Sequence, residues 1–296
     1  MSEIKAGGLY VDVGLSTANS VVLFLLLAFL VSSLGFELFF SIPYSKFATK
    51  EEIEKLSRVH IIKYAFHHRV NPRLGWALIY IFPVIVPAIA FAVYAVDNNE
   101  KIGKIAPSET YAILVFIGWI LSFTKRFLES QFLQVYSDTI PILTILIVSG
   151  GYSYCGFASV YFANQVEGYE ISPDSGTFVK DIICIVGYVV FISLNFHSHL
   201  TLRNIRKRNP EQPDKKYYSL HELGRLFVVL VCPHYVFEVA FWLCWAAFSG
   251  IATNWTSFGF TFFYLSIRTY KTYKWYVSKG LHTKPEDVIE AADFGV

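Results

Sequence analysis

Long apolar stretches recur along this chain, and their lengths match what an α-helix needs to cross a bilayer. A spanning helix takes about 20 apolar residues for a hydrocarbon core of about 30 Å. The apolar segments are Leu15–Phe40, Leu74–Val96, Tyr111–Phe123, Ile140–Phe162, Phe178–Leu200, Leu226–Phe248 and Ile251–Ile267. Only 16% of the 296 residues are charged, against about 25% in soluble domains. The sequence therefore predicts an all-α, polytopic membrane helix bundle of about seven transmembrane helices; six or eight remain open because the third and seventh segments are short.

The positive charges test this topology. All but four of the 25 Lys and Arg residues follow the first, third, fifth and seventh segments, and the exceptions are Lys5, Lys101, Lys104 and Lys180. Cytosolic loops carry the excess of Lys and Arg in membrane proteins. The pattern predicts a lumenal N-terminus and a cytosolic C-terminus. The segment Ser45–Arg73 has apolar residues at helical spacing among charges, so we expect a helix on the cytosolic surface there.

A polar stretch, Asn195–Arg208, ends the fifth apolar segment. Asn195, His199, Arg203 and Arg206 are spaced so that they share one face of a helix. Such a face is costly in lipid unless it has a function, and it suits a large anionic ligand. The alternative is a helix end whose cations reach out to the interface, which accounts for Arg206 but not for Asn195 or His199.

Two shorter polar clusters lie in other apolar segments. Lys125 and Arg126 end the third segment, and Glu129 follows Lys125 at the i,i+4 spacing of an exposed helix-end ion pair. The alternative is that Arg126 binds phosphate, for which its planar guanidinium is suited. The sixth segment contains Cys232-Pro233-His234-Tyr235, with Glu238 on the same helix face as His234. Tyr235 is a candidate proton donor or an interfacial anchor.

Several chemistries are excluded by spacing. The four cysteines form no CxxC pair, so we expect reduced packing residues rather than a disulfide or zinc framework. The eight histidines form neither HxxHH nor HExxH, and no P-loop or GxSxG is present. We predict no metal site and no nucleic-acid partner. Gly150, Gly151 and Gly156 follow no strand, so we expect close helix packing there, and a dinucleotide site in this chain has to be built from helices.

Four motifs in a fixed order resemble those of the steroid 5α-reductase family, and within it the trans-2-enoyl-CoA reductases of very-long-chain fatty-acid elongation. They are Lys125-Arg126-x-Leu128-Glu129-x-x-Phe132, Tyr154-x-Gly156-Phe157-Ala158, Asn195-Phe196-x-x-His199-x-x-Leu202-Arg203-x-x-Arg206 and Cys232-Pro233-x-Tyr235-x-x-Glu238. The resemblance covers roughly residues 125–280. Three positions depart from the family pattern: His234 stands where Asn is usual, Val135 where a second Arg is frequent, and Thr272 where His is usual.

The resemblance implies an enzyme of the endoplasmic reticulum membrane that uses NADPH. Residues expected to line the cofactor are Arg126, Asn195, His199, Arg203, Arg206, His234, Glu238 and Tyr276. Lys125 and Tyr235 match positions near the reacting enone, so they are the predicted catalytic residues. The second apolar segment lacks the Gln-Glu pair of the steroid branch, which argues against a 3-oxosteroid substrate.

The predicted function is NADPH-dependent reduction of the 2,3 double bond of a very-long-chain trans-2-enoyl-CoA, with fatty-acid elongase components as possible partners. The alternatives are a polyprenol or sterol double-bond reductase of the same fold, a methyltransferase of the isoprenylcysteine type, and a non-catalytic seven-span membrane protein. The predicted organisation is an N-terminal membrane part (1–124) with the amphipathic cytosolic segment, a reductase-like membrane domain (125–280) and a cytosolic tail (281–296).

Overall fold

The computed structural model describes residues 68–97, 107–134, 136, 139–166, 171, 173, 175–208 and 224–278, with positions 20, 21, 24, 27, 28 and 31 of the first apolar segment. The helices are α4 (Pro72–Asp97), α5 (Pro107–Leu128), α6 (Ile142–Ala163), α7 (Phe178–Arg208), α8 (Arg225–Leu230), α9 (Pro233–Ser249) and α10 (Ala252–Ser278). A π-helical turn, η2 (Glu129–Leu133), follows α5, and a short antiparallel pair joins β1 (Arg69–Val70) to β2 (Ile140–Pro141).

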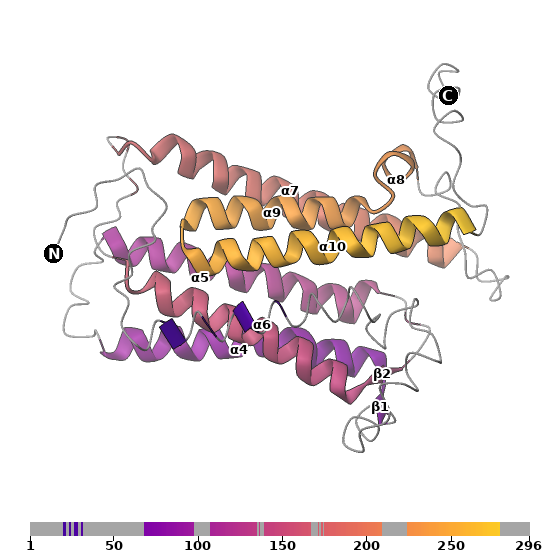
Figure 1. Ribbon diagram of the computed structural model, residues 1–296, viewed down its shortest axis with the longest axis horizontal. Coiled ribbons are helices and arrows are strands. Elements are labelled where there is room, and N and C mark those ends of the chain that lie inside the picture. Colours follow the sequence, from indigo (N-terminus) through magenta and orange to yellow (C-terminus); the bar gives the residue numbers. More distant parts are fainter. Residues whose placement is uncertain are drawn as a thin grey trace.

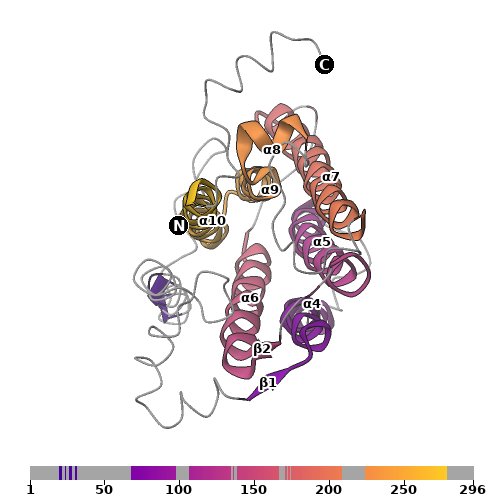
Figure 2. The ribbon, with the colours of Figure 1, turned by 90° about the vertical axis from the view of Figure 1, so that its right-hand side faces the viewer.

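The long helices lie side by side and form a bundle (Figure 1). Seen down their axes, α9 lies against both α7 and α10, and α4 lies against both α5 and α6 (Figure 2). The β1–β2 pair lies at one end of this bundle, and α8 lies beside the same end. The predicted all-α class is confirmed, with two-residue strands as its only sheet among the described residues.

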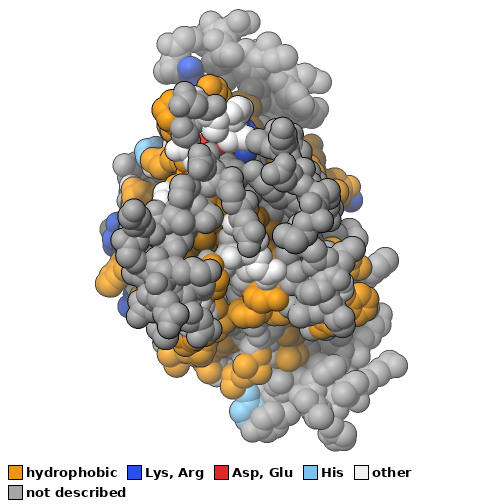
Figure 3. Space-filling view, turned by 90° about the vertical axis from the view of Figure 1, so that its left-hand side faces the viewer, with side chains coloured by type: hydrophobic (Ala, Val, Ile, Leu, Met, Phe, Trp, Pro, Cys, Tyr) orange, Lys and Arg blue, Asp and Glu red, His pale blue; other side chains and the backbone are white. Residues whose placement is uncertain are grey.

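Four helices of the described part have the length and apolar composition of membrane spans: Pro72–Ala95, Thr110–Leu133, Ile142–Ala163 and Phe178–Ile205. On α7, Val179, Ile183, Val186 and Val190 form a stripe that is 47–69% exposed. A continuous apolar stripe of this kind faces lipid rather than water. At the end of the bundle where α7 and α10 begin, hydrophobic side chains form the largest coloured area (Figure 3). The chain is therefore a multi-pass membrane protein.

The count of seven spans is not confirmed. The second to seventh predicted segments are all helical, but α9 has only 17 residues and α10 is richer in polar residues. The first segment lies outside the described residues apart from six positions, which are helical. Most of the predicted surface helix at 45–73 also lies outside them; its described end forms β1 and the start of α4. The division proposed at 124/125 falls inside α5.

The sixth predicted segment is broken rather than bent. Val231 has a φ of +56°, and α9 begins afresh with Pro233 in its first turn. Proline lacks the N–H for the helical bond to the fourth preceding carbonyl, and its ring clashes with that carbonyl, whereas both properties are tolerated at a helix start. The break places His234 and Tyr235 in the first turn of α9.

Proline in α4 is compensated by a neighbouring helix. Pro87 cannot donate to the carbonyl of Pro83, and the indole Nε1 of Trp119 in α5 donates to that oxygen at 2.8 Å. An unsatisfied carbonyl is expensive inside a membrane. Trp119 also packs at a tilt against Trp242 and Trp245 of α9, at centroid distances of 5.4 and 5.6 Å, so one side chain connects α4, α5 and α9.

Close helix contacts depend on glycines, and two of these glycines pack against tryptophans. A Cβ at Gly118 would lie 2.7 Å from Trp245, and a Cβ at Gly156 would lie 2.5 Å from both Pro87 and Trp119. The prediction of glycine-mediated packing is confirmed for Gly156, whereas a Cβ at Gly150 would meet no atom within 4 Å. The four cysteines are free, as expected.

Candidate active site

The predicted polar clusters come together at the end of the bundle that carries β1 and β2. Lys125 and Arg126 lie near the end of α5, Asn195 and His199 in the second half of α7, and His234 at the start of α9. Helices α5 and α7 run in the same direction and α9 runs back (Figure 1), and the hydrogen bonds among these side chains show that they meet at one level. The sequence places these residues far apart, and the fold makes them neighbours.

Asn195 is fully buried and connects α5 to α9. The Lys125 ammonium donates to Asn195 Oδ1, and Asn195 Nδ2 donates to the backbone carbonyl of His234 at 2.7 Å. Both the oxygen and the nitrogen of this buried amide thus have a hydrogen-bond partner, as buried polar groups normally do. The two predicted catalytic residues are therefore linked indirectly, since Tyr235 follows His234 in the chain.

Arg126 is the centre of the cluster. Its Nη1 lies 2.7 Å from His199 Nε2 and 3.4 Å from Glu129 Oε2, and its Nη2 lies 3.3 Å from Glu238 Oε2. The guanidinium also lies over the ring of Tyr80, 5.7 Å from its centroid. Three other helices and the π turn thus contact one side chain that is only 18% exposed.

The contact with Arg126 defines the state of His199. A guanidinium only donates hydrogen bonds, so His199 Nε2 must accept. The imidazole is then neutral, with its proton on Nδ1. The ring centroid of His234 is 5.3 Å away.

Glu129 corrects one interpretation of the sequence. The Lys125–Glu129 pair was expected at an exposed helix end, but Glu129 is 1% exposed, and its Oε1 lies 2.8 Å from Lys125 Nζ. Glu129 opens the π turn that follows α5, where it and Ser130 are buried, and the turn ends with Gln134 N donating to Glu129 O. Single π turns frequently occur at functional sites. Glu129 neutralises Lys125 and Arg126 from inside the protein.

Tyr235 lies on the side of the cluster that faces α10. Its ring centroid is 4.2 Å from that of His234, and its hydroxyl is hydrogen-bonded by the guanidinium of Arg268. Arg268 belongs to a cationic cluster noted in the sequence, but it was not among the predicted site residues. A cation at a phenol oxygen stabilises negative charge there.

The remaining predicted cofactor residues, Arg203, Arg206 and Tyr276, are not among the contacts of Arg126 described above. Arg203 is half-buried, and its Nε has no hydrogen-bond partner. Tyr276 packs with Ile205 and Phe227, beside α8. The side chain of Arg206 lies outside the described residues. On the same helix His197 is exposed, so it lies on the opposite face from Asn195 and His199.

Two tyrosines of the cluster were not predicted. Tyr80 lies under Arg126, and Tyr152 of α6 is close enough to Tyr80, Arg126 and Glu238 to interact electrostatically with them. Both occur in apolar helices rich in aromatic residues, where a phenol is indistinguishable by sequence from a packing residue. The spacing of Glu129 from Lys125 and Arg126 was visible, but its burial was not.

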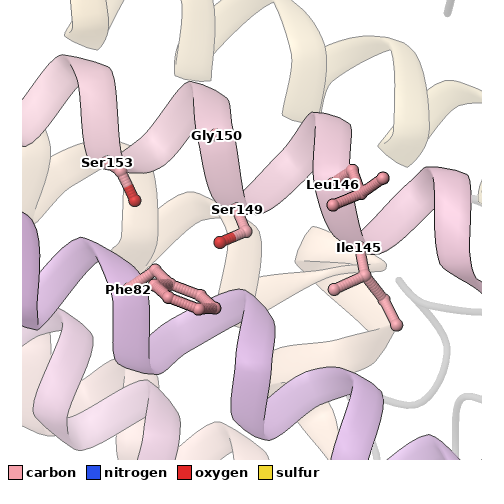
Figure 4. Close-up of a pocket in the computed structure, with 6 residues that line it drawn as sticks. All are labelled: Phe82, Ile145, Leu146, Ser149, Gly150 and Ser153. Carbon is pink, nitrogen blue, oxygen red and sulfur yellow. The ribbon is translucent and has the colours of Figure 1, made fainter.

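A cavity of about 240 Å³ lies elsewhere, between α4 and α6 (Figure 4). Its lining residues are Phe82, Ile145, Leu146, Ser149, Gly150 and Ser153. None of them belongs to the Arg126 cluster. Most of the side chains predicted to form the site thus contact one another, and a dinucleotide site built from these helices stays a prediction.

Comparison with known proteins relates the chain to membrane reductases of one family. Residues 138–285, half of the chain, match the family described as 3-oxo-5-alpha-steroid 4-dehydrogenase. The chain is 24% identical over 187 residues to the very-long-chain enoyl-CoA reductase of Dictyostelium discoideum, covering 63% of this chain and 59% of that protein. It is 29% identical over 198 residues to a putative enoyl-CoA reductase of Trypanosoma brucei brucei, covering 65% and 62%.

A steroid enzyme is also among the relatives. The chain is 23% identical over 219 residues to 3-oxo-5-alpha-steroid 4-dehydrogenase 1 of Macaca fascicularis, covering 73% of this chain and 76% of that protein. The matches thus span about three fifths of the length of the two enoyl-CoA reductases and a larger part of the steroid enzyme.

Proposed function

Because the chain belongs to the 3-oxo-5-alpha-steroid 4-dehydrogenase family, a family of reductases in membranes, we propose that it reduces the 2,3 double bond of a very-long-chain trans-2-enoyl-CoA with NADPH. The observation that carries this proposal is the meeting of Lys125, Arg126, Asn195, His199 and Glu238 at one end of the bundle. Two relatives named as enoyl-CoA reductases support the substrate class.

The donors present suit a nicotinamide dinucleotide. Arg203 has a buried Nε donor without a partner, and it forms no ion pair with a carboxylate of the described residues. Phosphate oxygens accept well from a guanidinium. Arg203 and Arg206 would hold the phosphates, while Asn195, His199, His234, Glu238 and Tyr276 line the rest of the cofactor.

Arg126 has a different part in this proposal. Both of its terminal nitrogens already contact His199, Glu129 or Glu238. It would therefore line the cofactor site chiefly by fixing the positions of His199 and Glu238.

NADPH, when bound, supplies the hydride that adds to the β-carbon of the enoyl thioester. Negative charge then develops on the thioester oxygen, and donors aimed at that oxygen lower the barrier. Tyr235 would donate its hydroxyl proton to the α-carbon, which completes the saturated thioester, and Arg268 would stabilise the negative charge left on the phenol oxygen. Lys125, held by Asn195 and Glu129, adds a second donor.

The membrane context is part of the proposal. The anionic CoA group would stay at the basic cytosolic face, and the acyl chain would lie among helices in the bilayer. The bias of Lys and Arg supports a lumenal N-terminus, a cytosolic C-terminus and a place in the endoplasmic reticulum membrane, where elongase components would supply the substrate.

The second candidate function is reduction of a sterol or polyprenol double bond. It is favoured by the similarity to the macaque steroid enzyme. Against it stands the stretch Gly75–Tyr80 in α4, which has no carboxylate. Competition between an enoyl-CoA and a 3-oxosteroid for NADPH consumption separates the two candidates.

The test is an assay of purified protein in detergent with NADPH and a long-chain trans-2-enoyl-CoA, followed by loss of NADPH absorbance. Tyr235→Phe should lower turnover by about 10²- to 10⁴-fold, the usual contribution of a general acid, with little effect on NADPH affinity. Tyr270→Phe, at a phenol that is 56% exposed on α10, is the control. A folded protein that consumes no NADPH refutes the proposal, and unchanged turnover in Tyr235→Phe removes Tyr235 from the mechanism.

A further inference from the structure

The cavity between α4 and α6 opens to the outside of the bundle. Leu146 is 63% exposed and Phe82 is 44% exposed, and Gly150 between them is also exposed. Both helices that form it are among the membrane spans. An opening at this place faces the hydrocarbon core, so whatever fills the groove comes from the bilayer.

The groove is suited to an apolar occupant. Its surface is formed by carbon atoms nearly throughout. The hydroxyls of Ser149 and Ser153 point from α6 toward α4 (Figure 4), where Ser149 Oγ donates to Leu78 O at 3.4 Å and Ser153 Oγ is buried without a hydrogen-bond partner, so the groove offers a water one unpaired hydroxyl. A trapped water needs two to four polar partners, and apolar cavities stay dry. Water therefore does not fill this space favourably.

Volume decides between a ring system and a chain. An engineered cavity of about 150 Å³ takes one benzene molecule, so about 240 Å³ corresponds to on the order of ten carbon atoms. A sterol has four fused rings and a side chain, and it does not fit. Part of a single acyl chain does.

The two faces of α4 decide between two sources of that chain. Phe82 lines the groove, whereas Tyr80, two residues earlier and therefore on nearly the opposite face of the helix, lies under Arg126. The groove runs along α6 from Ile145, nearest the β1–β2 end, to Ser153, past the level of Tyr152. A substrate whose thioester lies at the Arg126 cluster would carry its chain on the Tyr80 side of α4 instead.

A cation marks the outer end of the groove. Arg69 of β1 pairs with Pro141, just before α6, and donates from Nε to Thr139 Oγ1 at 2.7 Å and from Nη2 to Thr139 O at 2.8 Å. These bonds hold an exposed guanidinium one helical turn from Ile145. A phospholipid with its headgroup at this end would place a phosphate near Arg69 and a chain along the groove.

We propose that the α4–α6 groove binds one acyl chain of a phospholipid from the leaflet at the β1–β2 end, with an anionic headgroup favoured by Arg69. This proposal does not rest on the proposed function. Gly150 makes the groove possible, because a Cβ at this position meets no atom within 4 Å. A leucine side chain there would occupy the space of the lipid chain.

The test uses phosphatidylserine and phosphatidylcholine with a photoreactive diazirine in one acyl chain, in nanodiscs that contain the full chain. Label should concentrate on residues 145–153 several-fold above the exposed α7 stripe of Val179, Ile183, Val186 and Val190, which reports bulk lipid. Gly150→Leu should remove that excess. Gly259→Leu is the matched control, since a Cβ at Gly259 on α10 also meets no atom within 4 Å. Arg69→Gln should abolish the preference for phosphatidylserine.

Equal labelling of the groove and the α7 stripe in the unaltered protein overturns the proposal, and this comparison does not depend on the folding of any variant. Unchanged labelling in a folded Gly150→Leu protein overturns it as well. Displacement of the label by a long-chain enoyl-CoA, but not by unlabelled phospholipid, would assign the groove to the substrate instead. Loss of NADPH-dependent activity in the assay above leaves these outcomes unaffected, so the two proposals fail separately.

Discussion

Replacing Glu129 by Gln tests the charge balance of the cluster. The change keeps the size of the side chain and removes one of the two negative charges facing Lys125 and Arg126. Glu129 is 1% exposed and lies 2.8 Å from Lys125 Nζ. Breaking a buried ion pair by removing one partner costs about 3–5 kcal/mol, because the other charge stays buried. At about 2–4 °C per kcal/mol for a chain of this size, the midpoint of thermal unfolding should fall by on the order of 10 °C.

The assay is thermal unfolding in detergent, followed by tryptophan fluorescence. Trp119, Trp242 and Trp245 lie in contact in the core and report loss of packing between α5 and α9. The midpoints of thermal unfolding of the variants and of the unaltered protein are compared in the same detergent.

The control is a second change that restores neutrality. Combining Glu129→Gln with Lys125→Gln removes one charge of each sign, so the double variant should recover much of the loss of the single variant. A single variant within about 0.5 kcal/mol of the unaltered protein, as for surface substitutions, refutes the buried pairing. Failure of the double variant to recover stability refutes the charge argument.

Other predictions concern the backbone. Gly156→Ala should destabilise the protein by about 1–3 kcal/mol, because a Cβ there lies 2.5 Å from Trp119; Gly150→Ala on the same helix should not, and equal effects would refute the packing account. Val231→Gly should relieve the cost of a positive φ in a β-branched residue, about 1–3 kcal/mol, and so be more stable than Val228→Gly within α8 when both are unfolded thermally. The reverse order would show that Val231 is unstrained.

The sequence predicted which faces are polar but not what they contact. Asn195, His199 and Arg203 share a face because of helical spacing alone, and the structure places Asn195 and His199 against α5 and α9. The partner of Asn195 is Lys125, 70 residues away. A contact at that separation depends on how helices pack, which no local pattern records.

The sequence also could not predict which polar side chains are buried. A carboxylate four residues after a lysine is typical of a solvated helix end, and only the π turn places Glu129 inside. The interruption of the helix at Val231 has a visible cause in Pro233, two residues later. A proline in a helical segment can produce either a bend or a break, so the sequence alone did not decide between them. Tyr80 and Tyr152 were hidden among other aromatic residues of apolar helices.

The central claim is that the Arg126 end of the bundle binds a nicotinamide dinucleotide, and an equilibrium binding titration tests it most directly. NADPH, NADH and S-adenosylmethionine are titrated separately into purified protein in detergent. We predict saturable binding with preference for NADPH. Because a hydrogen bond to a charged group contributes about 1.5–3 kcal/mol, Arg203→Gln should weaken it by about tenfold or more, while Lys207→Gln, at an exposed cation of the same helix, should not. A folded protein that binds S-adenosylmethionine but not NADPH, or that binds neither, contradicts the account.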